Sequence, residues 1–258
     1  MICQMSYKRS KYFKTTSNKK IKYLFFNKKS QITVVFFHGF MSDMVGDKPK
    51  TIKNFCKRHN LNFLKFEYSG HGKSQGKFIE GNISKWSRES KELIKSKIKN
   101  KNKIIFIGSS MGAWIALNLF KSFKKQLHGF IGIASAPEFL ERLMWRKFSK
   151  KIKKIIMKKK IYYLEHGSFT YPLTKQLIFD GKKNKIFNKT IDLKIPIILF
   201  HGSKDDVVPL NISRKILKVC KNSKKKLIVI KNGDHSLSRK NDLKKICKQL
   251  HLIVTNLL

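Results

Sequence analysis

The chain has 258 residues, of which 58 are Lys or Arg and 15 are Asp or Glu, so its formal net charge at pH 7 is +43. This length suits one large α/β domain over residues 1–258, because no linker rich in Pro, Gly or Ser divides the sequence. No apolar run approaches the roughly 18 residues that a transmembrane helix needs.

The excess of basic residues raises nucleic acid or an anionic membrane as a partner, because such a chain adheres to polyanions at low salt. Only seven of the basic residues are arginine, the side chain best suited to bidentate recognition of phosphates and bases. The lysines are spread along the whole chain, and no zinc-finger spacing, RNP-like motif or helix-turn-helix pattern accompanies them. We therefore expect no specific nucleic-acid partner, and peripheral contact with an anionic membrane stays an alternative.

The cysteines and the N-terminal segment bear on the compartment. Cys3, Cys56, Cys220 and Cys247 are scattered, with no CxxC pair and no His at metal-ligand spacing. This pattern predicts free thiols, no metal site and a reducing, cytoplasmic compartment. Residues 1–20 form a basic, acid-free arm without a continuous apolar segment, so a mitochondrial transit peptide is the alternative.

Apolar runs alternate with amphipathic segments along the chain. Residues 21–26 predict a first, antiparallel edge strand, and further apolar runs predict strands at 32–37, 61–68, 103–107, 129–135, 195–202 and 225–230. Helical periodicity covers residues 48–59, 85–99, 110–124, 209–220 and 240–250. The alternation predicts an α/β fold with a mostly parallel central sheet, helices on both faces, and a ligand site at the carboxyl ends of the strands.

The stretch KIIFIGSSMG, residues 103–112, predicts a strand that turns sharply into a helix. Ser110 has a glycine two residues before it and another two residues after it, whereas Ser109 is out of this register. A Gly-x-Ser-x-Gly turn holds the serine in a strained conformation at a helix N-terminus, where free N–H groups stabilise negative charge. Ser110 is therefore the candidate nucleophile, and an ordinary Gly/Ser-rich loop is the alternative.

An acyl-transfer site also needs a base, an acid that orients it, and N–H donors for the oxyanion. His235 follows one predicted strand, and Asp205 and Asp206 follow the strand before it, so the chain order is Ser, Asp, His. Phe40 follows an earlier strand, and its N–H together with that of Met111 are the candidate oxyanion donors.

Four motifs together resemble the α/β-hydrolase superfamily, from about Tyr23 to near the C-terminus. They are HGFMSDMVGDK, FEYSGHGKSQG with ISKW, GSSMGAW and HGSKDDVVP. The resemblance is greatest to a mitochondrial branch with palmitoyl-protein thioesterase and acyl-glucuronide esterase activities. Ala113 departs from that branch, which usually has a second glycine at this position.

The resemblance implies roles for the candidate residues. Ser110 is the nucleophile, His235 the base and Asp205 the acid, while Phe40 and Met111 donate to the oxyanion and no cofactor is required. The Gly-x-x-Asp-x-x-Val-Pro register within HGSKDDVVP also favours Asp205, which leaves Asp206 as a solvated loop or cap residue.

Two regions are candidates for contact with the substrate. His71, in SGHGKS, is one, with a role confined to its loop as the alternative. Residues 137–190 are expected to form a helical cap or lid insertion, in which an apolar stripe at helical spacing opposes basic residues. The stripe is compatible with a cap helix over an acyl pocket, with a basic amphipathic helix on anionic lipid, or with plain core packing. If it covers an acyl pocket, its candidate substrate contacts are Leu140, Leu143, Met144 and Phe148.

The sequence as a whole predicts a serine hydrolase that cleaves acyl esters or thioesters through an acyl-enzyme. A palmitoyl-protein thioesterase-like or carboxylesterase activity on an acylated small molecule or protein is expected. The alternatives are a monoacylglycerol-lipase-like or general carboxylesterase activity and, outside enzymes, a lysine-rich protein that binds nucleic acid or a membrane surface.

Overall fold

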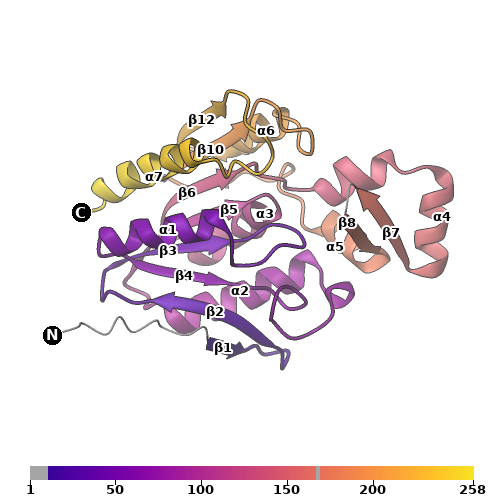
Figure 1. Cartoon of the computed structure of the whole chain (residues 1–258), viewed down its shortest axis with the longest axis horizontal. Coiled ribbons are helices and arrows are strands. Elements are labelled where there is room, and N and C mark those ends of the chain that lie inside the picture. Colours follow the sequence, from indigo (N-terminus) through magenta and orange to yellow (C-terminus); the bar gives the residue numbers. More distant parts are fainter. Residues whose placement is uncertain (1–10, 167–168) are drawn as a thin grey trace.

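A computed structural model describes residues 11–166 and 169–258, and it shows an eight-stranded sheet between two layers of helices (Figure 1). The strand order is β1-β2-β4-β3-β5-β6-β10-β12. β1 pairs antiparallel with β2, β2 pairs antiparallel with β4, and all later neighbours in this order are parallel. The predicted fold class is therefore confirmed. The strands are β1 (Lys11–Lys14), β2 (Lys20–Phe26), β3 (Ile32–Phe37), β4 (Asn62–Phe66), β5 (Lys103–Ser109), β6 (Leu127–Ile133), β10 (Pro196–Gly202) and β12 (Lys224–Ile230).

The N-terminal edge of the sheet differs from the sequence prediction. β2 is antiparallel as expected, but it is not the edge, because β1 pairs along its outer side. Five residues of the basic arm expected at 1–20, Lys11–Lys14 and Lys20, thus belong to the sheet. Residues 1–10, on which the transit-peptide alternative depends, lie outside the described residues.

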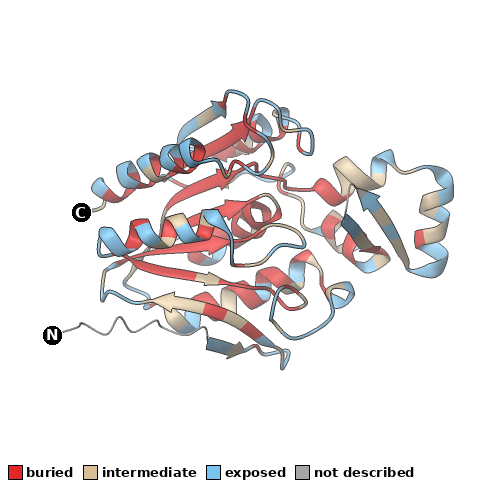
Figure 2. Cartoon of the chain, viewed as in Figure 1, coloured by how far each residue is buried: buried red, intermediate tan, exposed pale blue. Residues whose placement is uncertain are grey.

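Alternate side chains of the central strands enter two separate cores. In β3 all six residues are buried, with Val35 and Phe37 in one core and Val34 and Phe36 in the other. Helices α2 (Ile83–Lys97), α3 (Met111–Leu119) and α6 (Asn211–Val219) cover the first core, and α1 (Asp47–Arg58) and α7 (Lys240–Thr255) cover the second. Burial on both faces explains why these strands are apolar without interruption, and Figure 2 shows them as the buried centre of the molecule.

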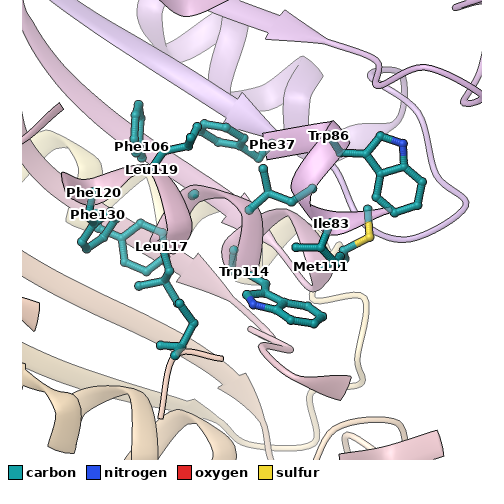
Figure 3. Packing of buried hydrophobic residues seen from close by; sticks show 14 of the residues in the cluster. Phe37, Ile83, Trp86, Phe106, Met111, Trp114, Leu117, Leu119, Phe120 and Phe130 are labelled. Atoms are coloured by element: carbon teal, nitrogen blue, oxygen red, sulfur yellow. The ribbon is translucent and has the colours of Figure 1, made fainter. Parts of the chain in front are cut away.

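Helix α3 is buried on almost every side. Figure 3 shows its Met111 and Trp114 close to Ile83 and Trp86 of α2, and all four side chains are fully buried. A helix that is apolar all round is stable only in the centre of a protein. The N-terminus of α3 is therefore held firmly against the sheet. The helix expected to reach residue 124 ends at Leu119, and a 3₁₀ turn continues the chain.

The segment between β6 and β10 forms a layer that we call the cap (residues 137–190), which projects from one end of the sheet (Figure 1). It contains a π-helical turn, a 3₁₀ turn and two α-helices. It also contains a hairpin, which was not predicted from the sequence. These elements are η3 (Leu140–Met144), η4 (Trp145–Lys147), α4 (Lys150–Lys159), β7 (Ile161–His166), β8 (Phe169–Thr174) and α5 (Lys175–Lys183). Outside the cap are the 3₁₀ turn η1 (Phe78–Glu80) and a short parallel pair, β9 (Ile191–Asp192) with β11 (Cys220–Lys221).

The apolar stripe of the cap does not form one helix. The prediction of a single cap helix along the stripe is therefore wrong. Phe148 has extended backbone, with φ −66° and ψ 140°. Ser149 then begins α4 as its N-cap, and its hydroxyl accepts a hydrogen bond from the N–H of Ile152. A serine at this position satisfies an otherwise unpaired N–H of the first turn, so the chain restarts its helix here.

Glu138 joins the two ends of the cap. Its backbone is left-handed, with φ 59°, and the residue is almost fully buried. The carboxylate accepts hydrogen bonds of 2.8 Å from the N–H groups of Ile186 and Phe187 and from Nε of Arg142. Hydrogen bonds to a buried charge are stronger than neutral ones, so this cluster fixes where the cap leaves and rejoins the sheet. In the described part of the chain, no helix is both long and apolar enough to cross a membrane.

Candidate active site

Ser110 lies at the sharp turn between β5 and α3. Its φ of 52° and ψ of −118° fall in a region that L-residues rarely adopt. The flanking glycines are needed because the backbones meet closely. A Cβ on Gly108 would lie 2.4 Å from Cα of Ala113, and one on Gly112 would lie 2.3 Å from the carbonyl oxygen of Phe37. The turn predicted from the glycine spacing is thus present.

Three loops bring Ser110, His235 and Asp205 into one hydrogen-bonded row. Nε2 of His235 lies 3.1 Å from Oγ of Ser110, and Nδ1 lies 2.9 and 3.1 Å from the two carboxylate oxygens of Asp205. A carboxylate only accepts hydrogen bonds, so Nδ1 carries the proton and Nε2 is free to accept from the serine hydroxyl. This is the arrangement that a serine nucleophile and its base require.

Asp205 is held as a buried carboxylate, its side chain being 1% exposed. Burial is the largest influence and raises the pKa of Asp205, but the hydrogen bond and charge of His235 and the N–H of Val208 outweigh it. The pKa therefore lies below its ordinary value, and the group is ionised at neutral pH. The neighbouring Asp206 is exposed and lies on the cavity wall described below.

His201 lies beside the site and was not singled out from the sequence. It is fully buried, and its Nε2 donates to the carbonyl oxygen of Val208 at 2.8 Å, while Nδ1 accepts from Oγ of Ser213 at 2.9 Å. The same Nε2 lies 3.4 Å from the Asp205 carboxylate. Burial is the main reason that the pKa of His201 is lowered, so the ring is neutral and supports the Asp205 loop by hydrogen bonding.

The two candidate oxyanion donors lie on either side of the serine. Met111 is the first residue of α3, so its N–H has no partner within the helix. Phe40 follows Gly39, whose position lies against the serine, since a Cβ added there would be 3.5 Å from Cβ of Ser110. Among the described residues, no turn or loop hydrogen bond to a backbone carbonyl uses the N–H of Phe40 or Met111.

A cavity of about 1010 Å³ opens beside Ser110 and His235, between the sheet and the cap. Its apolar wall comes from both layers and includes Phe40, Phe139, Leu143, Met144, Leu164 and Tyr171. Such a wall excludes water from an apolar substrate chain, and each methylene buried there stabilises the complex by about 0.8 kcal/mol.

The structure separates the predicted substrate contacts into two groups. Leu143 and Met144 lie on the cavity wall. Leu140, Phe148 and His71 are not among the residues that line the cavity. Leu140 is fully buried in the core, and Phe148 packs beside the ring of Tyr162, with centroids 6.2 Å apart.

The interpretation of His71 as a substrate contact is not supported, because its ring lies within an aromatic cluster. Its centroid is 4.9 Å from Trp86, 5.0 Å from Phe78 and 5.1 Å from His38. Burial is the main cause that lowers the pKa of His71 to about 3, and that of His38 to about 4. Both rings are therefore neutral at physiological pH. His71 serves packing, whereas His38 also lies on the cavity wall.

The hairpin supplies cavity residues that sequence reasoning missed. Leu164, Phe169 and Tyr171 of β7 and β8 line the cavity. The Tyr171 ring stacks on Phe40 at 5.8 Å, so the cap touches the residue that carries a candidate oxyanion donor. Two runs rich in aromatic residues on either side of the Gly167-Ser168 dipeptide were the available sequence signal.

Over residues 11–166 and 169–258, no group of three or more His, Cys, Asp or Glu side chains is placed to hold a metal ion. Cys56, Cys220 and Cys247 are free thiols, and burial raises the pKa of Cys220 to about 12. Cys3 lies outside the described residues.

The amino-acid sequence of the chain is similar to a protein family and to several named proteins. Residues 28–174 match the model of a family described as serine aminopeptidase, S33. The mitochondrial palmitoyl-protein thioesterase ABHD10 of Bos taurus is 27% identical over 215 residues, which cover 81% of this chain and 69% of that protein. The human protein of the same name has the same identity and coverage.

Solved structures extend the similarity over nearly the whole chain. A putative hydrolase from Agrobacterium vitis S4 has a TM-score of 0.90 at 25% identity and covers 95% of this chain and 98% of its own. Alpha/beta hydrolase domain-containing protein 10 from mouse has a TM-score of 0.87 at 23% identity, covering 97% and 100%. The family model spans more than half of the chain, and the chain therefore belongs to the serine aminopeptidase S33 family of α/β-hydrolases.

Proposed function

We propose that this protein is a serine hydrolase that cleaves acyl esters or thioesters by forming an acyl-enzyme on Ser110. The observation that carries the proposal is the hydrogen-bonded row from Asp205 through His235 to Ser110. The row ends beside a cavity with an apolar wall, where an acyl chain and its carbonyl group fit together.

The geometry supports a two-step reaction. His235 removes the proton of Ser110 as Oγ attacks the carbonyl carbon, and Asp205 stabilises the imidazolium that forms. The N–H groups of Phe40 and Met111 donate to the tetrahedral oxyanion. His235 then protonates the departing alcohol or thiol, and a water molecule repeats the sequence on the acyl-enzyme.

The substrate class that we favour is a long acyl thioester, as in S-palmitoylated protein. The names of the mammalian relatives support this class, and so does the apolar wall that Leu143 and Met144 extend. A monoacylglycerol-lipase-like or general carboxylesterase activity is the second candidate, because a cavity of about 1010 Å³ also admits a bulkier leaving group. The same relatives are named as mitochondrial, which supports the mitochondrial alternative for the compartment.

A covalent probe tests the proposal directly. The protein is treated with a fluorophosphonate and its intact mass is measured for the wild type, Ser110→Ala and Ser109→Ala. We expect one adduct on the wild type and on Ser109→Ala, and none on Ser110→Ala. An adduct that persists on Ser110→Ala, or a folded wild type that takes none, would contradict the proposed nucleophile.

Comparison of substrates then separates the candidate activities. A palmitoyl thioester peptide, a monoacylglycerol and p-nitrophenyl acetate are assayed under the same conditions. We expect a much higher kcat/KM on the palmitoyl thioester than on p-nitrophenyl acetate, because its acyl chain buries more apolar surface. A higher value on the monoacylglycerol would favour the lipase-like alternative.

A further inference from the structure

The cap holds a dense group of positive charges. Nine of the fifteen residues from Arg146 to Lys160 are Lys or Arg, whereas the whole chain has 58 among 258. No Asp or Glu occurs from Arg142 to Leu164. The density is thus well above the lysine-rich background of the protein, and in the described part of the chain Arg146 alone among these nine is ion-paired, with Glu141.

Helix α4 presents four of these charges on one face. Lys150, Lys151, Lys154 and Lys158 are exposed, and at 3.6 residues per turn they span an arc of about 100°. Ile156, the buried residue of α4, points to the opposite side. None of the ion pairs found in the described part of the chain includes a lysine of α4. The charges of this face are therefore free to act on a partner.

Exposed apolar side chains accompany the charges. Met157 is 44% exposed, Tyr163 is 58% exposed and Phe169 is 64% exposed, all within the cap. Figure 2 shows most residues of α4 and part of the hairpin coloured as exposed. Lys147 and Phe169 also line the cavity, so the basic and apolar residues of the cap adjoin the candidate active site.

We propose that the cap binds an anionic phospholipid surface, with the α4 lysines facing the head groups. Lysine together with exposed aromatic and aliphatic side chains is typical of segments that lie in a membrane interface. An RNA or DNA surface is less favoured, because α4 has six lysines and no arginine. For its substrate class, this proposal rests on the proposed function. Acyl chains of substrates anchored in a membrane reach Ser110 from the same surface to which the cap binds.

Vesicle binding tests the surface by itself. The protein is sedimented with vesicles of phosphatidylcholine alone and of phosphatidylcholine with phosphatidylserine, at about 0.15 M salt. We expect binding to the anionic vesicles only. Replacing Lys150, Lys151, Lys154 and Lys158 by Gln should lower the partition coefficient by up to about 600-fold, because each lysine near such a surface contributes about fivefold.

A charge-matched variant is the control. Lys240, Lys244, Lys245 and Lys248 are exposed on α7, which lies at the other end of the molecule from the cap (Figure 1). Replacing these four by Gln removes the same charge and should lower binding by less than about threefold. Equal losses in the two variants would show that only net charge matters, and would overturn the proposal.

Two further measurements complete the test. Tyr163→Ser should weaken binding to anionic vesicles several-fold without changing the turnover of p-nitrophenyl acetate, and an unchanged partition coefficient would contradict an interfacial role for the hairpin. Binding of single-stranded RNA is measured for both lysine variants. RNA binding that depends on α4, with vesicle binding unchanged, would overturn the proposal in favour of a nucleic-acid surface.

Activity at the membrane separates the inference from the proposed function. We expect the wild type to cleave a palmitoylated peptide faster in anionic than in neutral vesicles, and the α4 variant to lose this gain while cleaving p-nitrophenyl acetate normally. Hydrolysis without vesicle binding would overturn the inference alone. Vesicle binding by a protein that hydrolyses neither substrate would overturn the proposed function and leave the surface in place.

Discussion

The catalytic edge of the sheet and the cap differ in how firmly their residues are held. At the edge, Ser110 follows β5, in which every residue after Lys103 is buried, and precedes α3, in which nearly every residue is buried. In the cap, α4 buries Ile156 alone, and the hairpin exposes Tyr163 and Phe169. The candidate catalytic groups thus depend on rigid elements, while the proposed acyl-binding wall includes residues of a less buried layer.

This difference has consequences for substitution. Changes at the catalytic edge should alter the rate for every substrate, because they affect the positions of the reacting atoms. Changes in the cap should alter which acyl chains are preferred, while turnover of small esters is retained.

Ser110→Ala should lower kcat by about 10⁴- to 10⁶-fold for long and short acyl substrates alike, because no covalent intermediate can form. Ser109→Ala, at the end of the same strand, is the matched control and should change kcat by less than about tenfold. Steady-state turnover of p-nitrophenyl esters measures both. A Ser110 variant that loses activity on long chains only would place the serine in substrate selection instead of chemistry.

Asp205→Asn should lower kcat by about 10³- to 10⁴-fold, because the amide no longer fixes the His235 tautomer or stabilises its charge. Asp206→Asn removes the neighbouring carboxylate, which is exposed, and should change kcat only a few-fold. The two variants are compared at one pH, with thermal unfolding as a check on folding. Equal losses would show that the acid had been assigned to the wrong residue.

Replacing Leu143 and Met144 by Ser should lower kcat/KM for palmitoyl substrates by about 10- to 100-fold, since the two half-buried side chains together contribute about 1.5–3 kcal/mol. Turnover of acetyl esters should stay within a few-fold. Phe148→Ser is the control in the cap, because Phe148 packs behind the wall and should keep the chain-length preference. Loss of acetyl-ester turnover in the double variant would show that the cap also positions the reacting groups.

His71→Phe should change stability but not catalysis. Because the pKa of His71 is about 3 in the folded protein and about 6.5 when unfolded, the unfolded chain binds an extra proton between these values. The free energy of unfolding therefore falls as pH decreases from 6.5 towards 3, by up to about 1.4 kcal/mol per pH unit for this group.

Urea unfolding at pH 7 and pH 5 measures this slope for the wild type and for His71→Phe. The variant should have the shallower slope, and its kcat/KM at pH 7 should stay within a few-fold. An unchanged slope would contradict a buried, neutral imidazole. A large loss of kcat/KM would restore His71 as a substrate contact.

Agreement between sequence and structure is greatest where a residue depends on its neighbours in the chain. The apolar runs of β3 and β5 predicted strands because both faces of a central parallel strand are buried. The predicted turn at Ser110 followed from two glycines that no other residue can replace without a backbone clash. In the cap, periodicity was misleading, because the N-cap Ser149 divides one apparent stripe into two segments.

The layers of the sheet, the turn at Ser110 and the order of the three candidate catalytic residues could be predicted from the amino-acid pattern, because each depends on local conformation and on burial patterns with a short period. The surroundings of these residues depend on how separate elements pack. His201 supports the Asp205 loop through Val208 and Ser213, and the hairpin brings Tyr171 against Phe40. Such contacts join segments far apart in the chain, and a sequence pattern does not specify which side chains meet when separate elements pack.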